Sequence, residues 1–177
     1  MTAVPDVLET VAPEAWHEQV RAAKDEGHTM FDWLTAVDRM GDATPGFDVV
    51  VRLLRLPGGG EDLLRGIRLT TRVGDGESLA SITDLYAGAA WHERETHEMF
   101  GIGFDGFVDH TDLGLRPLLL PDGFEGTPLR KSFQLAARAS KVWPGGKEPG
   151  EGHDSAKSPS RRRVQAPGVP PPEWGPR

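Results

Sequence analysis

Cysteine is absent from the 177-residue chain, and this absence excludes several kinds of site at once. Without cysteine the chain has no disulfide, no thiolate nucleophile and no ligand for the usual iron–sulfur cluster, which is held by cysteine thiolates. If the protein works in a redox machine, we expect the electrons to pass through its neighbours.

Long apolar runs are also lacking. No uninterrupted apolar stretch approaches the ~20 residues that a membrane-spanning helix needs. The N-terminus has no basic region followed by an apolar stretch of signal-peptide length. We therefore expect contact with a membrane only through partners.

Positive charge is scarce in most of the chain, whose formal net charge is −7. Residues 147–177 hold six basic and four acidic side chains, which leaves −9 for residues 1–146. An acidic body argues against nucleic-acid binding, because phosphate neutralisation needs a positive face. The basic cluster Arg161-Arg162-Arg163 is interpreted as solvated charge in a tail, with an acidic partner surface or lipid headgroups as the alternative.

The C-terminal part has the composition of an extended tail. From residue 144 onward the chain holds eight of its fifteen prolines in 34 residues. Such a segment buries too little apolar surface to offset the entropy of ordering. We predict a folded domain over residues 1–143 and a tail over residues 144–177, with Trp143 or Trp174 as an anchor on another subunit.

Near the N-terminus, residues 13–26 have the pattern of an amphipathic helix. A proline is acceptable in the first turn of a helix, and Trp16, Val20 and Ala23 recur at the spacing of one helix face. Gly27 supplies a stop, so the helix is expected to end there.

Three strands are predicted at residues 29–38, 47–56 and 64–73. The third alternates apolar and polar side chains as a half-buried strand does, and the second is a nearly continuous apolar run. A proline and three glycines at residues 57–60 mark a turn, which indicates an antiparallel hairpin. The side chains expected to share an inward face are Phe31, Trp33 and Val37 in the first strand and Ile67, Leu69 and Val73 in the third.

A second helix is predicted from Ser81 to Phe100, with a break at Gly88 as an alternative. Ser81 with Asp84 three residues on is similar to a capping box, and residues 118–120 are expected to add a short strand. Together these elements predict an α+β domain with a small mixed, largely antiparallel sheet covered by helices.

The stretch from Trp91 to Ile102 is crowded with ionisable side chains, and spacing decides between its interpretations. Zinc proteases place two histidines at i and i+4, whereas His92 and His97 are five apart and so about 140° apart around a helix. Glu93 and His97 have the i, i+4 relation. One alternative is a metal site that these two residues form with His110 and Asp112, and the other is a surface pair.

The next six residues, 101–106, match the glycine pattern of dinucleotide-binding loops. The context is reversed, because a helix precedes the pattern and a loop follows it, so no helix N-terminus is available for a phosphate. We interpret Gly101 as the residue just past a helix end, where a left-handed conformation favours glycine.

Several separated motifs, in the same order, resemble the signature of the 30 kDa subunit, also called the C subunit, of NADH-quinone oxidoreductase (respiratory complex I). The resemblance covers roughly residues 28–134. The motifs are Glu93-Arg94-Glu95 with Glu98 and Met99-Phe100-Gly101-Ile102, then His110-Thr111-Asp112-Leu113, then Arg116 with residues 118–126, and finally Pro128-Leu129-Arg130-Lys131.

The chain departs from the family pattern at a few positions. The family usually has Asp where Glu98 stands, Pro where Thr111 stands, and Asp-Tyr where Ser132-Phe133 stands. The loop between Phe104 and Pro121 is also longer than the usual pattern. These changes affect the expected partner contacts more than the fold.

The resemblance implies a structural subunit of the peripheral arm of a proton-translocating oxidoreductase, on the cytoplasmic side of the cell membrane. It implies no catalytic, metal or cofactor-binding residue in this chain, with the iron–sulfur clusters, FMN and quinone held by partners. The expected partners are the quinone-site subunit and the terminal iron–sulfur subunit. The residues expected to contact partners or hold the structure are Glu93, Arg94, Glu95, Glu98, His110, Asp112, Arg116, Pro128, Leu129, Arg130 and Lys131.

Two more specific expectations follow. Arg94 and at least one neighbouring glutamate are expected to form ion pairs inside the domain or with an adjoining subunit. Residues 128–131 are expected to dock on the quinone-site subunit, because proline restricts the backbone and arginine offers a planar fork for carboxylates. The alternative functions are the equivalent subunit of a related oxidoreductase or membrane-bound hydrogenase with another electron donor, and a stand-alone metal-dependent enzyme.

Overall fold

Four strands form the main sheet of the computed structural model, which describes residues 6–57 and 64–134. They are β1 (Asp6–Thr10), β2 (Met30–Asp38), β3 (Phe47–Arg55) and β4 (Arg65–Val73), in the spatial order β1-β4-β3-β2. Strands β2, β3 and β4 pair antiparallel, and β1 pairs parallel with β4. The predicted mixed, largely antiparallel sheet and the β3–β4 hairpin are confirmed.

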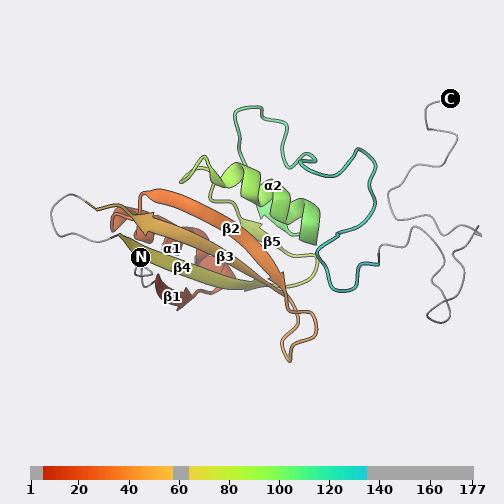
Figure 1. Cartoon of the computed structure of the whole chain (residues 1–177), viewed down its shortest axis with the longest axis horizontal. Coiled ribbons are helices and arrows are strands. Elements are labelled where there is room, and N and C mark those ends of the chain that lie inside the picture. The colour runs from red at the N-terminus through yellow and green to blue at the C-terminus, as the bar shows by residue number, and fades with distance from the viewer. Residues whose placement is uncertain (1–5, 58–63, 135–177) are drawn as a thin grey trace, which may run out of the picture.

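The predicted N-terminal helix is also confirmed. It consists of the short 3-10 helix η1 (Pro13–Ala15) followed by α1 (Trp16–Asp25). Trp16, Val20 and Ala23 are buried in the core, as their spacing indicates. Figure 1 shows α1 behind the sheet, so this helix covers one of its two faces.

Alternation places one set of side chains from the two central strands in the core. Phe47, Val49, Val51 and Leu53 of β3 are fully buried, and Ile67, Leu69 and Val73 stand beside them on β4 as predicted. Fully burying a side chain of this size stabilises a fold by roughly 1.5–3 kcal/mol. The two central strands are therefore the main source of apolar burial in the sheet.

The predicted inward face of β2 is wrong from Trp33 onward: Trp33 and Val37 pair with the outward-facing Arg52 and Asp48 of β3. The register with β3 shifts between Phe31 and Trp33, which is a β-bulge or similar irregularity. One extra residue turns every later side chain to the opposite face. Leu34 and Ala36 are consequently buried, whereas Val37 is 41% exposed.

The sheet face away from α1 carries ion pairs. The carboxylate of Asp6 lies 2.9 Å from Arg52 and 2.9 Å from Arg68, and Asp48 lies 2.6 Å from Arg72. Hydrogen bonds from Arg52 lower the pKa of Asp6. This arrangement neutralises the arginines that alternation with the apolar core residues brings to this face.

A second layer follows the sheet in the chain. It contains β5 (Ser78–Ala80), α2 (Ala89–Phe100) and β6 (Gly103–Asp105), with β5 and β6 paired in parallel. Helix α2 runs beside β2, as Figure 1 shows. The strands β1, β5 and β6 have no clear sequence signal, because β5 and β6 have three residues each and β1 is largely exposed.

Two further expectations about the ends of elements are corrected. Helix α2 begins at Ala89 and not at Ser81; residues 83–85 and 87–88 form turns before it. Residues 118–120 form no strand.

Within residues 6–57 and 64–134, no helix is long and apolar enough to cross a membrane. The predicted tail over residues 144–177, Trp143 and the three consecutive arginines lie outside the described residues.

Candidate functional site

Helix α2 carries the charged motif and ends as its sequence predicts. Gly101 follows the helix with φ of 75°, and its N–H donates to the carbonyl of His97. The positive φ favours glycine at this position, and a β-carbon there would also lie 2.9 Å from a guanidinium nitrogen of Arg130, which would have to move. The prediction that Gly101 ends a helix is confirmed.

Glu93 is fully buried and fixes the turn that precedes α2. Its carboxylate accepts hydrogen bonds from the Ser81 hydroxyl at 2.6 Å and from the Ile82 N–H at 2.8 Å. The Ser81 hydroxyl therefore serves Glu93 and does not cap a helix. Burial raises the pKa of Glu93 to about 7, although both hydrogen bonds favour the charged form.

Arg94 is buried beside Glu93 and holds a different segment. Its guanidinium donates to the carbonyl of Arg116 at 3.1 Å and to the carbonyl of Pro117 at 2.6 Å. Among the described residues, Arg94 therefore forms no ion pair with a glutamate, and the expected ion pair inside the domain is corrected. Peptide carbonyls take the place of the carboxylate, and α2 is joined to a loop more than twenty positions away.

Glu98 is the third charged residue of α2 that binds its own chain, and it explains why residues 118–120 form no strand. Its carboxylate accepts from the N–H groups of Leu118, Leu119 and Leu120 at 3.1, 2.9 and 2.8 Å. Three successive N–H groups that converge on one anion form a nest, whereas a strand would direct them alternately to either side. The apolar run therefore bends around the carboxylate.

Residues 106–134, which we call the wrapping segment, follow β6 and contain no helix or strand among the described residues. Within it Asp109 accepts from the Thr111 hydroxyl and from Arg116, both at 2.6 Å. The hydrogen bond from the Thr111 hydroxyl holds the pKa of Asp109 well below its usual range, and the hydrogen bond from Arg116 adds to this effect. His110 and Asp112 are exposed, and Asp112 adopts a left-handed backbone conformation with φ of 54°.

The end of the wrapping segment returns to the sheet and α2. Arg130 donates to the carbonyl of Phe100 at 2.6 Å and to Asp75 at 2.8 Å, and it lies 4.9 Å from the Phe47 ring centre. The N–H of Leu129 donates to the carbonyl of Met99. Arg130 therefore holds the domain together, while the Leu129 side chain stays 54% exposed.

Asp38 anchors the same return from the edge of the sheet. This buried carboxylate accepts from the N–H of Met40 at 2.8 Å and from the N–H of Lys131 at 2.7 Å. Those two backbone donors lower its pKa. The Lys131 side chain is exposed, and Pro128 is half-buried, so only part of the predicted docking sequence faces outward.

The four residues of the candidate metal site do not converge. Glu93 faces Ser81 and Ile82, while His97 hydrogen-bonds the carbonyl of Ile102 at 2.8 Å. Among residues 6–57 and 64–134, no three His, Asp or Glu side chains are placed to hold a metal ion. The geometry gives the stand-alone metal enzyme no support.

Glu95 differs from its neighbours in the motif because its side chain is exposed. Trp91, one helical turn earlier, is 65% exposed. Beside it lies a hollow of about 280 Å³, which we call the Trp91 groove; its lining residues are Thr83, Ala87, Ala90, Trp91, Val108, Asp109 and His110.

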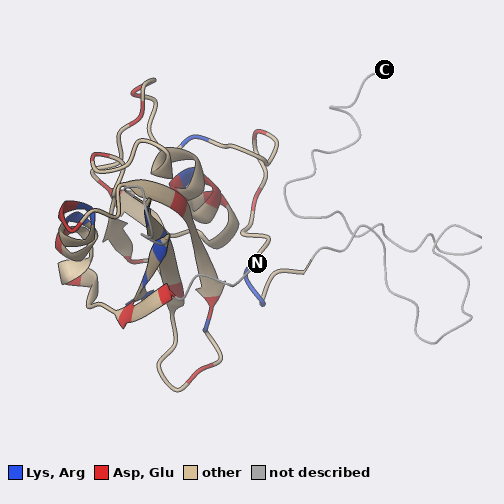
Figure 2. Ribbon diagram, turned by 60° about the vertical axis from the view of Figure 1, so that its left-hand side comes forward, with Lys and Arg blue, Asp and Glu red and all other residues tan. Residues whose placement is uncertain are grey.

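Charge is distributed unevenly over the domain. The strands of the sheet carry both acidic and basic positions, whereas the loops that leave the sheet and α2 carry mostly acidic positions (Figure 2). Residues 1–134 contain 23 acidic and 12 basic side chains, a formal charge of −11. This surface favours contact with cationic groups.

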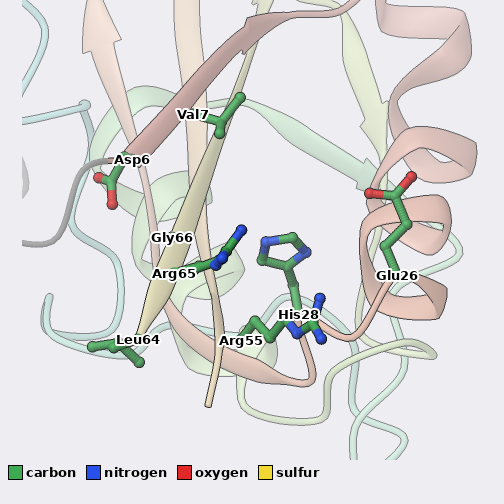
Figure 3. A pocket seen from close by; sticks show the side chains of 8 residues that line it. All are labelled: Asp6, Val7, Glu26, His28, Arg55, Leu64, Arg65 and Gly66. Atoms are coloured by element: carbon green, nitrogen blue, oxygen red, sulfur yellow. The ribbon is translucent and has the colours of Figure 1, made fainter. Parts of the chain in front are cut away.

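A larger hollow, of about 680 Å³, lies where β1 and β4 approach the end of α1. His28, Arg55 and Arg65 lie around it, as Figure 3 shows. Arg55 and Arg65 stand directly opposite each other on β3 and β4. The connection between these strands contains Glu61 and Asp62, outside the described residues, so the arginines alone do not define an anion site.

Sequence reasoning placed the motif on the correct helix but missed the residues to which it binds. Ser81, Asp38 and the backbone groups of residues 116–120 have no pattern that predicts a long-range contact. Trp91 had a usable signal, because it lies four positions before Glu95 and therefore on the same helix face as that charged residue.

This geometry defines a class of protein: an α+β domain whose charged helix holds its own loops in place. The chain belongs to the family of the 30 kDa subunit of respiratory-chain NADH dehydrogenase, whose model matches residues 9–139. It is 36% identical over 141 residues to the C 2 subunit of NADH-quinone oxidoreductase from Rhizobium etli, an alignment that covers 78% of this chain and 70% of that protein. The resemblance drawn from the motifs is confirmed.

Two solved structures share the fold. A trypsin-resistant fragment of Nqo5 aligns with a TM-score of 0.50 and 27% identity, over 56% of this chain and 79% of the fragment. A chain of a membrane-bound sulfane sulfur reductase, an archaeal respiratory membrane complex, aligns with a TM-score of 0.51 and 20% identity, over 63% of this chain and 65% of that chain. The second similarity concerns the fold alone.

Proposed function

We propose that this chain is a structural subunit of the peripheral arm of a proton-translocating NADH-quinone oxidoreductase and carries no cofactor of its own. Its family and its relatives among NADH-quinone oxidoreductase subunits support the type of assembly. In the proposal it packs against the quinone-site subunit and the terminal iron–sulfur subunit. FMN, iron–sulfur clusters and quinone belong to partners, and the chain reaches the cytoplasmic side of the cell membrane through them.

The use of the charged motif is the observation that carries this proposal. Glu93, Arg94 and Glu98 are ionisable groups of α2 that a catalytic site could use, and all three instead bind groups of their own chain. The hydrogen bonds of Arg94 and Glu98 hold the wrapping segment, which exposes apolar side chains that a partner surface could cover. The exposed members are Val108, Leu113, Leu119 and Leu129.

Purification of the tagged chain from detergent-solubilised membranes of its native host tests the proposal. We expect the chain to bring with it the quinone-site and iron–sulfur subunits and NADH:quinone activity. A tagged protein of similar size and charge from the same cells is the matched control. Recovery of the chain alone, with stoichiometric zinc or iron that His97→Ala removes, would contradict the proposal.

A related assembly with another electron donor is the second candidate. The fold shared with a chain of the sulfane sulfur reductase complex favours keeping it, as do Thr111 and Ser132-Phe133, where the chain departs from the family pattern. The genes that neighbour this one distinguish the two candidates: genes for NADH-oxidising subunits would favour the first. Their replacement by genes for a hydrogenase or a sulfur reductase favours the second.

A further inference from the structure

Trp91 stands at the first turn of α2 with most of its indole in solvent. A single exposed aromatic needs no explanation, but Trp91 and the 52% exposed Val108 both line one hollow. Its volume of about 280 Å³ is just below the range of roughly 300–1,000 Å³ found for small-molecule sites. A protein side chain suits this space better than a cofactor does.

The walls of the Trp91 groove are fixed before anything binds. The Thr83 hydroxyl accepts from the N–H of Val108 at 3.0 Å and lies 2.8 Å from the Ser81 hydroxyl. Ser81 is in turn held by Glu93. The side chain of Asp109 is held by Arg116. Binding therefore requires little ordering of the groove, which favours affinity.

The charges around the groove indicate what the occupant carries. Asp84 is already paired with His17 and Arg21, and Asp109 is paired with Arg116. Glu95 is exposed one turn from Trp91, so both face the same side of α2. Besides Asp109, His110 is the titratable residue that lines the groove. An occupant with a cation next to its apolar anchor would complement Glu95 and the acidic domain.

We propose that the Trp91 groove seats an apolar side chain of a partner subunit, on a segment that also presents lysine or arginine to Glu95. This inference rests on the proposed function, because it takes the chain to be part of a larger assembly. In this view Glu93, Arg94 and Glu98 shape the interface from inside, and the contact is made by Trp91 and Glu95, which the internal hydrogen bonds leave exposed.

Photo-crosslinking within the assembled complex identifies the occupant. A photoreactive phenylalanine replaces Trp91 in the full chain, and crosslinked peptides are sequenced after irradiation. We expect crosslinks to a partner subunit, at an apolar residue with lysine or arginine close by. Crosslinks confined to residues 135–177 of the same chain, which carry eight basic and four acidic side chains and two tryptophans, would overturn the proposal. Crosslinks confined to a second copy would overturn it equally.

Two variants and a control measure the contact energetically. Trp91→Ala is expected to weaken binding of the chain to its partner subunits at least about tenfold, as truncation of a central aromatic does. Glu95→Lys is expected to weaken it about threefold or more, with a larger effect at low salt. Glu18→Lys, the same charge change at an exposed position of α1, should leave binding unchanged.

Melting of each free variant separates binding from folding. Trp91 and Glu95 are exposed, so all variants should melt like the parent chain, and Glu95→Lys remains informative even if Trp91→Ala melts lower. If the parent chain assembles and both variants bind as tightly, the groove is not an interface. If the parent chain assembles with no oxidoreductase subunit, the proposed function fails before the groove is tested.

Discussion

The sheet and the wrapping segment meet at α2, yet they are held by different forces. Strands β3 and β4 bury a continuous row of apolar side chains, whose stabilisation is spread over many contacts. The wrapping segment, residues 106–134, has no regular elements. Carboxylates and guanidinium groups bind its backbone at separate points, and Phe107, Leu115 and Leu120 pack against the core only partly buried. One domain therefore contains a part fixed by its hydrophobic pattern and a part fixed by individual side chains.

The largest expected effect comes from the part fixed by pattern. Leu69 is 1% exposed and stands opposite Val51 in the middle of the sheet. Leu69→Ala should lower the free energy of unfolding by about 2–5 kcal/mol, through lost burial and a residual cavity. Urea unfolding measures the loss, and Leu8→Ala on β1, at a position that is 66% exposed, should stay within about 0.5 kcal/mol of the parent. Equal losses would show that the core is not centred on β4.

The same division explains how much of the fold could be predicted from sequence. Helix α1 and strands β3 and β4 follow directly from side-chain spacing, because a buried face imposes its period on the sequence. The inward face of β2 could not be predicted, since an irregularity between Phe31 and Trp33 leaves no mark in an apolar pattern. Strands β5 and β6 are too short for a period to show.

The candidate site was predictable only in its location. Its motif lies on α2, and Gly101 ends that helix as expected. The partners of Glu93, Arg94 and Glu98 are mostly backbone groups. Every residue supplies a backbone carbonyl, and every residue except proline supplies a backbone N–H. Sequence alone therefore indicates that these side chains matter, but not which segments they hold.

The buried carboxyl group of Glu93 should make the stability of the domain depend on pH. Glu93 is expected to keep its proton up to a pH of about 7 when folded, against about 4.5 in the unfolded chain. Between these values the folded state binds more protons than the unfolded state, so stability falls as pH rises from 4.5 to about 7. The full change is on the order of 3 kcal/mol.

Glu93→Gln removes this titration and should flatten the stability curve between pH 5 and 7, as measured by urea unfolding at successive pH values. Glu95→Gln, at an exposed position of the same helix, is the matched control and should keep the parent profile. A parent and Glu93→Gln variant with parallel curves would show that Glu93 is ionised throughout. The two hydrogen bonds from Ser81 and Ile82 would then outweigh burial.

The smallest effect is expected for a change that releases the wrapping segment and spares the sheet. Arg94→Met keeps an apolar side chain in the buried site but removes the donors to the carbonyls of Arg116 and Pro117. The loss should be about 2 kcal/mol, the size of a hydrogen bond made by a charged group. Amide exchange should quicken, and protease cleavage should appear, within residues 106–134, while β3 and β4 keep their protection. Arg21→Met, which removes the exposed ion pair between α1 and Asp84, is the control and should leave the protection of residues 106–134 unchanged. If Arg94→Met instead exposes the amides of β3 and β4, the sheet depends on the wrapping segment, and the two parts form one cooperative unit.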